Sequence, residues 1–249
     1  MAGHAKAYHP GDTISLKCGP LNAGKSVKLG RYIDSGGSTS IFQLADDPSK
    51  AIRLPKDEML VQFDAKMIPP SQFITFFING YAPMKNAGVP VVRMYDFCKG
   101  KYVIVDYLEE RLSLQDFLVQ YDHLDPKERE TIFNALVDFA LTTSPFDDIG
   151  DFKSTSLVYS KSLNLWRLID LTQHHKRHKS ENSDETPFNY LFREVEILQL
   201  LQDGKIRKQV LDGLILRLDE AIQMKRHHSC EPELSRLSPT RTNHEEIGR

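Results

Sequence analysis

Short runs of β-prone residues dominate the first third of the chain. Between Thr13 and about Lys56 the runs TISLKC, KLGRYI, SIFQLA and KAIRL alternate with Gly, Asp and Pro, which predicts an antiparallel meander. Residues Ser71–Asn86 have the spacing of a short helix, although they contain a glycine and a proline. Two more strand-like runs, VPVVRMYDF and KYVIVDYL, meet at the short segment Lys99–Lys101, which predicts a hairpin.

Beyond Leu112, apolar residues recur at helical spacing. Asp125, Pro126 and Glu128 provide an N-cap, a first-turn proline and an early acidic residue for one helix. Two strand-like pieces follow, SLVYS and LWRLIDL, and amphipathic helices are expected over 187–202 and 205–226. We therefore predict an α+β fold with a flexible N-terminus (1–12), a β-rich lobe (13–108), a mostly helical lobe (109–226) and a disordered tail (227–249).

Composition narrows the range of partners. The 249 residues are 40% hydrophobic and 27% charged, and the formal net charge of −2 gives no reason to expect nucleic-acid binding. No apolar run approaches the roughly 18 residues of a membrane span, and the N-terminal segment MAGHAKAYHP lacks the apolar centre of a secretory signal. Because Cys18, Cys98 and Cys230 lie far apart in sequence, we expect free thiols in a reducing compartment.

A glycine-rich turn separates two predicted strands in Ile33–Phe42 (IDSGGSTSIF). At Gly36 and Gly37 no Cβ intervenes, so backbone N–H groups, including that of Ser38, can approach phosphate oxygens closely. Protein kinases carry the pattern G-x-G-x-x-G at the corresponding place. An ordinary hairpin turn explains the same residues without any ligand.

Two further runs follow the order of protein-kinase motifs. KAIRLP places Arg53 where the third kinase strand has the lysine of V-A-I-K, with Lys56 as a nearby substitute; a surface arginine is the simpler interpretation. The acidic partner of that lysine on the next helix is missing, and Gln72 is the nearest candidate. YVIVDYLEE resembles the strand and connection between kinase lobes, which implies that backbone groups of Asp106 and Leu108 hold adenine.

The most informative runs are IGDFKSTS and RLIDLT. Kinases place H-R-D-x-K-x-x-N ahead of a hairpin that ends in D-F-G. By this correspondence Asp151 would accept the proton of the attacking hydroxyl, and Lys153 would neutralise charge on the transferred phosphoryl group. Asp170 would bind Mg²⁺, and Ser156 takes the place of the asparagine that also binds metal.

In the order and spacing of these motifs, the segment from about Leu29 to Thr172 resembles the minimal protein-kinase-like effectors of pathogenic bacteria (the OspG, NleH and HopBF type). The resemblance implies a protein-kinase-like two-lobe fold with a trimmed helical C-lobe. It also implies binding of ATP and Mg²⁺, and transfer of the γ-phosphate to a serine or threonine of a host protein. Such a protein is soluble and is delivered into host cytoplasm by a bacterial secretion system; otherwise we expect a cytoplasmic protein.

Two other functions are compatible with the sequence. Arg53 in place of lysine and Ser156 in place of asparagine also fit a pseudokinase that binds a nucleotide or a protein without turnover. The run GPLNAGKS at Gly19–Ser26 satisfies the P-loop pattern, with Lys25 on the phosphates, but only about two helical turns can follow it. The basic loop at 174–179 (HHKRHK) has no Cys or carboxylate at ligand spacing, so we expect it to be solvated rather than metal-bound.

Overall fold

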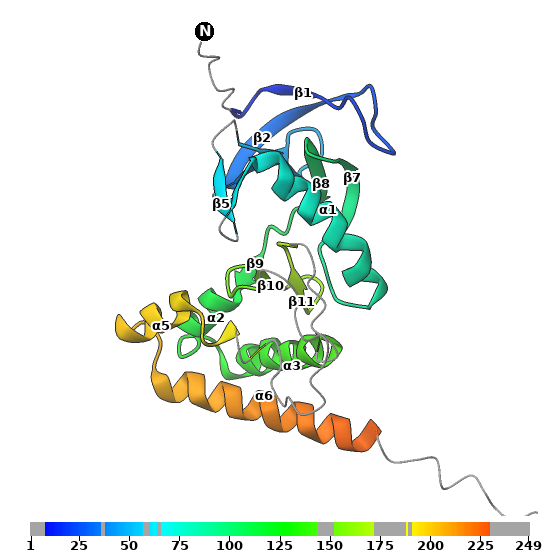
Figure 1. Cartoon of the computed structure of the whole chain (residues 1–249). Helices are drawn as coiled ribbons and strands as arrows, with labels where there is room; N and C mark the ends of the chain where they lie inside the picture. The colour runs from blue at the N-terminus through cyan, green and yellow to red at the C-terminus, as the bar shows by residue number, and fades with distance from the viewer. Residues whose placement is uncertain are drawn as a thin grey trace, which may run out of the picture.

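A curled six-stranded antiparallel sheet forms the N-terminal part of the protein (Figure 1). The computed structural model describes residues 8–35, 38–56, 60–63, 66–143, 152–171, 188 and 191–229. The strand order is β1-β2-β3-β4-β8-β7, so the predicted meander and the β7–β8 hairpin are confirmed. The bounds are Thr13–Ser15 (β1), Ser26–Ser35 (β2), Thr39–Leu44 (β3), Lys50–Pro55 (β4), Met94–Cys98 (β7) and Tyr102–Asp106 (β8).

Strand β4 is buried on both of its faces. Ile52 and Leu54 belong to a core on one side of the sheet, whereas Ala51 belongs to a larger core on the other side. Helix α1 (Pro70–Asn86) packs against that second side. Because successive residues of a strand point to opposite faces, Arg53 shares the face of Ala51 and lies on the side of α1.

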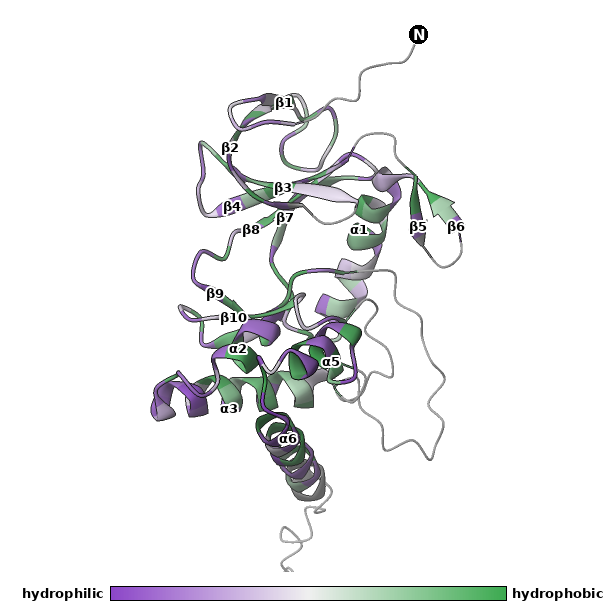
Figure 2. Ribbon diagram, turned by 90° about the vertical axis from the view of Figure 1, so that its left-hand side faces the viewer, coloured by the Kyte–Doolittle hydropathy of each residue, from purple (hydrophilic) through white to green (hydrophobic). Residues whose placement is uncertain are grey.

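Helix α1 confirms the helix predicted from the sequence. It begins at Pro70, where the fixed φ of proline suits the first turn. Its buried apolar side chains recur at helical spacing: Ile74, Phe77, Ile78, Tyr81 and Met84. A small hairpin of β5 (Val61–Phe63) and β6 (Lys66–Ile68), which the sequence did not predict, lies beside α1 (Figure 2).

The C-terminal part combines a three-stranded antiparallel sheet with helices, as Figure 1 shows, so the predicted α+β class is confirmed. No helix in the described ranges is long and apolar enough to cross a membrane. Helix α5 begins later than predicted, and α6 continues beyond residue 226. The bounds are Arg111–Ser113 (β9), Leu114–Gln120 (α2), Pro126–Thr143 (α3), Leu157–Ser160 (β10), Leu165–Leu168 (β11), Val195–Gln202 (α5) and Lys208–Ser229 (α6).

Trp166 of β11 organises the core of this second part. Its side chain is fully buried, and its Nε1–H donates to the carbonyl oxygen of Ile132 in α3 at 3.0 Å. The rings of Phe117 in α2 and Tyr159 in β10 lie against it, with centroids 6.0 and 5.6 Å away. One indole therefore ties β11 to its neighbouring strand and to both helices.

Strand β11 also joins the two parts of the protein. The Leu168 N–H donates to the Pro90 carbonyl at 2.9 Å, and the Val92 N–H donates to the Leu168 carbonyl at 3.1 Å. Arg167 forms an ion pair of 2.8 Å with Asp106 at the end of β8. The chain that leaves β11 is therefore held directly beneath the six-stranded sheet.

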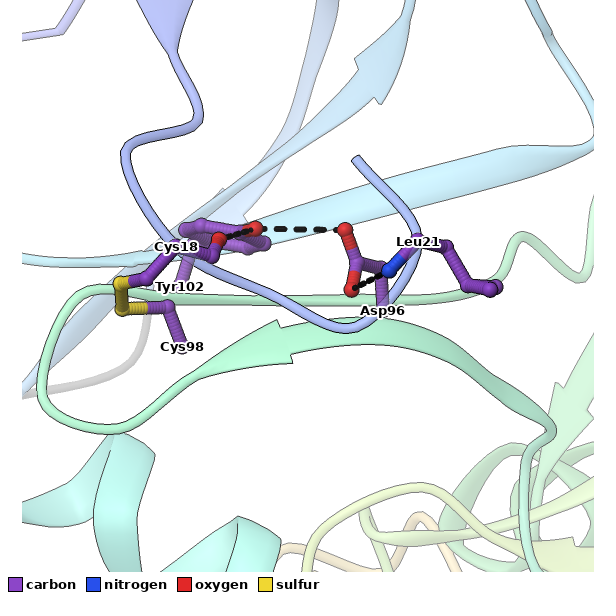
Figure 3. Close-up of a disulfide and its surroundings, with 5 residues drawn as sticks. All are labelled: Cys18, Leu21, Asp96, Cys98 and Tyr102. Atoms are coloured by element: carbon purple, nitrogen blue, oxygen red, sulfur yellow. Dashed lines mark hydrogen bonds between the residues drawn. A yellow bond between two sulfur atoms is a disulfide. The ribbon is translucent and has the colours of Figure 1, made fainter. Parts of the chain in front are cut away.

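A disulfide between Cys18 and Cys98 contradicts the expectation of free thiols (Figure 3). The two residues are 80 positions apart in sequence, but their Cα atoms lie 5.6 Å apart because the sheet curls. Beside the disulfide the Tyr102 hydroxyl donates to the Cys18 carbonyl and to the buried Asp96 carboxylate. Burial, and then the Asp96 charge, raises the pKa of Tyr102 to about 12, so the hydroxyl stays a donor.

We predict that the double substitution Cys18→Ser with Cys98→Ser destabilises the protein. A cross-link that closes a loop of this length is worth about 4 kcal/mol in the chain-entropy account, so the midpoint of urea unfolding should fall. A reductant should destabilise the natural chain but not the double variant, and Cys230→Ser serves as the control. Equal unfolding of the natural chain with and without reductant would contradict the prediction.

Candidate functional site

A cleft of about 440 Å³ lies between the six-stranded sheet and the C-terminal part. Seven of the ten residues predicted for the site line it: Ser38, Arg53, Asp106, Leu108, Lys153, Ser156 and Asp170. The other three, Gly36, Gly37 and Asp151, lie outside the described residues. The fold thus brings residues from the glycine turn, β4, the connection after β8 and both sides of the β10–β11 hairpin to one cavity.

Both aliphatic and polar side chains line the cleft. Ile41 of β3, Ala51 of β4 and Val105 of β8 line it with aliphatic groups, and Ile169 follows β11. Arg53, Lys153, Ser156 and Asp170 are among the polar side chains of the lining, which also includes Asp34 and Arg111. A ligand with a flat apolar part and an anionic part matches this combination.

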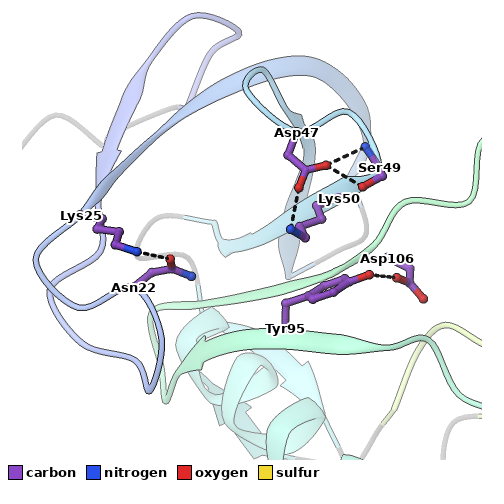
Figure 4. Close-up of polar contacts among 7 residues, drawn as sticks. All are labelled: Asn22, Lys25, Asp47, Ser49, Lys50, Tyr95 and Asp106. Carbon is purple, nitrogen blue, oxygen red and sulfur yellow. Dashed lines mark hydrogen bonds and ion pairs between the residues drawn. The ribbon is translucent and has the colours of Figure 1, made fainter.

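The connection after β8 is fixed by its own side chains rather than by a ligand. The Asp106 carboxylate accepts hydrogen bonds from the Tyr95 hydroxyl at 2.7 Å and the Arg93 N–H at 3.2 Å, and it pairs with Arg167. Figure 4 shows the contact between Tyr95 and Asp106. The carboxylate of Asp106 therefore positions the backbone of the connection.

Leu108 offers the backbone donor of this connection. The preceding N–H, of Tyr107, is used by the carbonyl of Ser49 at 2.8 Å. The Leu108 N–H makes no hydrogen bond with the described part of the chain. Since Leu108 also lines the cleft, this group can serve a ligand.

Arg53 is held by an acidic residue and an aromatic ring. Its Nη1 lies 2.9 Å from Oδ1 of Asp170, and its Cζ lies 5.0 Å from the centroid of the Phe77 ring in α1. The side chain of Arg53 is 10% exposed, while that of Asp170 is 43% exposed. Helix α1 contains no Asp or Glu, and Gln72, the expected nearest partner, does not line the cleft.

The loop that carries Lys153 and Ser156 is a tight turn ahead of β10. The Ser156 N–H donates to the Lys153 carbonyl at 2.9 Å, and the Ser156 carbonyl accepts the N–H of Ile169 at 2.9 Å. The side chain of Lys153 is exposed, whereas Ser156 is buried. The turn thus fixes both residues relative to the chain that continues to Asp170.

Glu194 contacts this turn through the N–H of Ser154, a role that was not predicted from the sequence. Its Oε2 accepts the N–H of Ser154 at 3.0 Å across 40 residues of sequence. Its Oε1 and the Ser154 Oγ are both buried without a hydrogen-bond partner among the described residues. Burial raises the pKa of Glu194, against the opposing effects of the hydrogen bond from the Ser154 N–H and the charge of Lys153. A glutamate just before an amphipathic helix looks like a helix cap, so no local signal reveals this role.

The residues expected to hold Mg²⁺ do not form a metal site by themselves. Asp170 already binds Arg53, so a cation at the same oxygen would lie beside a guanidinium. The other expected ligand, Ser156, is a neutral hydroxyl with low affinity for Mg²⁺. The described ranges contain no group of three or more His, Cys, Asp or Glu residues that could hold a metal ion.

The P-loop interpretation lacks the helix that it requires. Residues 20–24 form turns, and strand β2 begins at Ser26 in place of a helix. Lys25 contacts Asn22 of the same turn at 3.5 Å (Figure 4). Gly19 has a structural reason of its own: its φ is 131°, and a Cβ there would lie 2.7 Å from Oδ1 of Asp96.

We predict that Glu194→Gln changes how stability depends on pH. Since the folded state raises the pKa of Glu194 above its ordinary 4.5, it holds the proton more tightly than the unfolded state. That contribution is present at low pH and is lost as the pH rises through the raised pKa. Glutamine can still accept the Ser154 N–H.

The measurement is urea unfolding between about pH 4 and about pH 7. The unfolding free energy of Glu194→Gln relative to the natural chain should rise with pH. Glu220→Gln, at an exposed position of α6, serves as the control. Parallel curves for the natural chain and Glu194→Gln would contradict the prediction.

No protein-family model matches this sequence, and no curated protein matches it. Its function therefore has to be inferred from the cleft itself.

Proposed function

We propose that the protein is a protein-kinase-like domain of two lobes that binds ATP in the cleft and transfers the γ-phosphate to a serine or threonine hydroxyl. One observation carries the proposal. Seven residues chosen from kinase-like motifs that span 38–170 line a single cavity of about 440 Å³. Unrelated motifs have no reason to converge in this way.

The base of the nucleotide is assigned to the aliphatic side chains of the cleft. Ala51 and Val105 have short side chains that leave room for a ring, and both are buried. The Leu108 N–H supplies a donor for a ring nitrogen. This arrangement is the usual form of a small-molecule site, with aliphatic walls and a few oriented polar groups.

The phosphates are assigned to the cationic side chains of the cleft. Arg53 would hold phosphate oxygens through N–H donors that Asp170 leaves free, and Lys153 would neutralise charge on the transferred group. In the reaction the substrate oxygen attacks the γ-phosphorus while the bond from that phosphorus to the β–γ bridging oxygen breaks. The hydroxyl proton passes to a base, for which Asp151 is the prediction. The resemblance to bacterial effectors extends the proposal to a host protein as substrate.

A nucleotide-binding module without transfer is the second candidate. The observation that favours it is the ion pair between Arg53 and Asp170, because it engages the carboxylate that kinases use for metal. In this case the cleft would bind nucleotide and transfer nothing.

The test is incubation of the full chain with γ-labelled ATP and a protein lysate, together with thermal unfolding in ATP. ATP at 100 times its Kd should stabilise the fold by about 2.7 kcal/mol. Lys153→Met should lower transfer by about 100-fold and keep the stabilisation, while Lys161→Met, an exposed lysine paired with Glu128 outside the cleft, should change neither. Stabilisation without transfer would favour the module, and neither effect would refute the proposal.

A further inference from the structure

We infer that Arg53 takes the place of the divalent cation, so that the cleft binds a nucleoside triphosphate without metal. The inference rests on the proposed nucleotide site and specifies the form of ligand that this site accepts. It comes from the pair between Arg53 and Asp170 and from what surrounds that pair.

The guanidinium of Arg53 has N–H donors that Asp170 does not use, and Arg53 lines the cleft. A guanidinium carries five N–H donors, and Arg53 makes only the bond to Asp170 within the described part of the chain. Its other nitrogens do not belong to the fully buried side-chain atoms that lack a partner among the described residues, so they are not sealed inside the protein. Since Arg53 also lines the cavity, these donors are open to an anion there.

The position of Arg53 is fixed before any ligand arrives. Asp170 holds one edge of the guanidinium at 2.9 Å, and the ring of Phe77 lies 5.0 Å from its Cζ. An arginine can bind a carboxylate and phosphate oxygens at once because its donors lie in one plane and point in different directions. Arg53 can therefore bridge Asp170 and a phosphate, which is the connection that a metal ion would otherwise make.

The surroundings favour this arrangement over a metal ion. A lysine in this place is normally drawn away from the metal-binding aspartate by an acidic side chain on the neighbouring helix, but α1 has none. Asp106, another carboxylate of the cleft, is already bound by Arg167. Arg111 and Lys153 add two positive charges to the same cavity and Asp34 adds one negative charge, so with both ion pairs taken as neutral a net positive charge remains. These side chains favour the free triphosphate anion as ligand.

The experiment is calorimetric titration of the full chain with ATP, once in excess EDTA and once in MgCl₂. The two Kd values should agree within about threefold. A Kd at least tenfold lower in MgCl₂ would overturn the inference and leave the proposed nucleotide site standing. No binding under either condition would refute the nucleotide site itself.

Arg53→Lys tests the bridge directly. A single ammonium cannot hold a carboxylate and two phosphate oxygens in one plane, so binding in EDTA should weaken at least tenfold and MgCl₂ should restore part of it. Arg217→Lys is the matched control and should leave both Kd values unchanged, because Arg217 lies outside the cleft, where its Nη2 contacts both carboxylate oxygens of Glu130. Unchanged binding by Arg53→Lys in EDTA would overturn the inference. If that variant fails to fold, the EDTA comparison on the natural chain alone decides.

Discussion

Two ion pairs of opposite sense hold the end of β11 against the six-stranded sheet. The guanidinium of Arg167 pairs with the carboxylate of Asp106 in β8, and the carboxylate of Asp170 pairs with the guanidinium of Arg53 in β4. A shift of β11 would separate both pairs and bring charges opposite uncharged strand residues. Arg167 and Asp106 are largely buried, and Arg53 is 10% exposed although Asp170 is 43% exposed. Loss of a partner would therefore leave a poorly solvated charge at each site, so these contacts specify where the chain after β11 lies. The position of Asp170 beside Arg53 in the cleft depends on that placement.

The identities of residues 53 and 77 explain each other. A lysine ammonium is strongly hydrated, and it is usually paired with a carboxylate when it is buried. A guanidinium is less hydrated and stacks on aromatic faces. Arg53 beside Phe77 is therefore a consistent pair. Helix α1 contributes an aromatic surface where an acidic group was expected.

Most of the helices and strands could be predicted from local sequence patterns, whereas the features that were missed depend on contacts between segments distant in sequence. The strands around KAIRLP, helix α1 and the cap of α3 by Asp125, whose Oδ1 accepts the Lys127 N–H at 2.9 Å, follow from periodicity and short motifs. The order of the motifs was also enough to predict that Arg53, Lys153 and Asp170 lie in one cleft. The support of Ser154 by Glu194 could not be predicted, because it depends on how α5 docks and leaves no trace in the local sequence.

The disulfide has a consequence for how separate molecules meet. In the strand order β1-β2-β3-β4-β8-β7, Cys18 follows the first strand and Cys98 ends the last, so the bond ties the two edges of the sheet to one another. Open edges are where sheets of different molecules add to each other and begin to aggregate. Joined edges leave less room for such strand addition. The same covalent bond that strengthens the fold thereby helps to keep each copy of the protein separate.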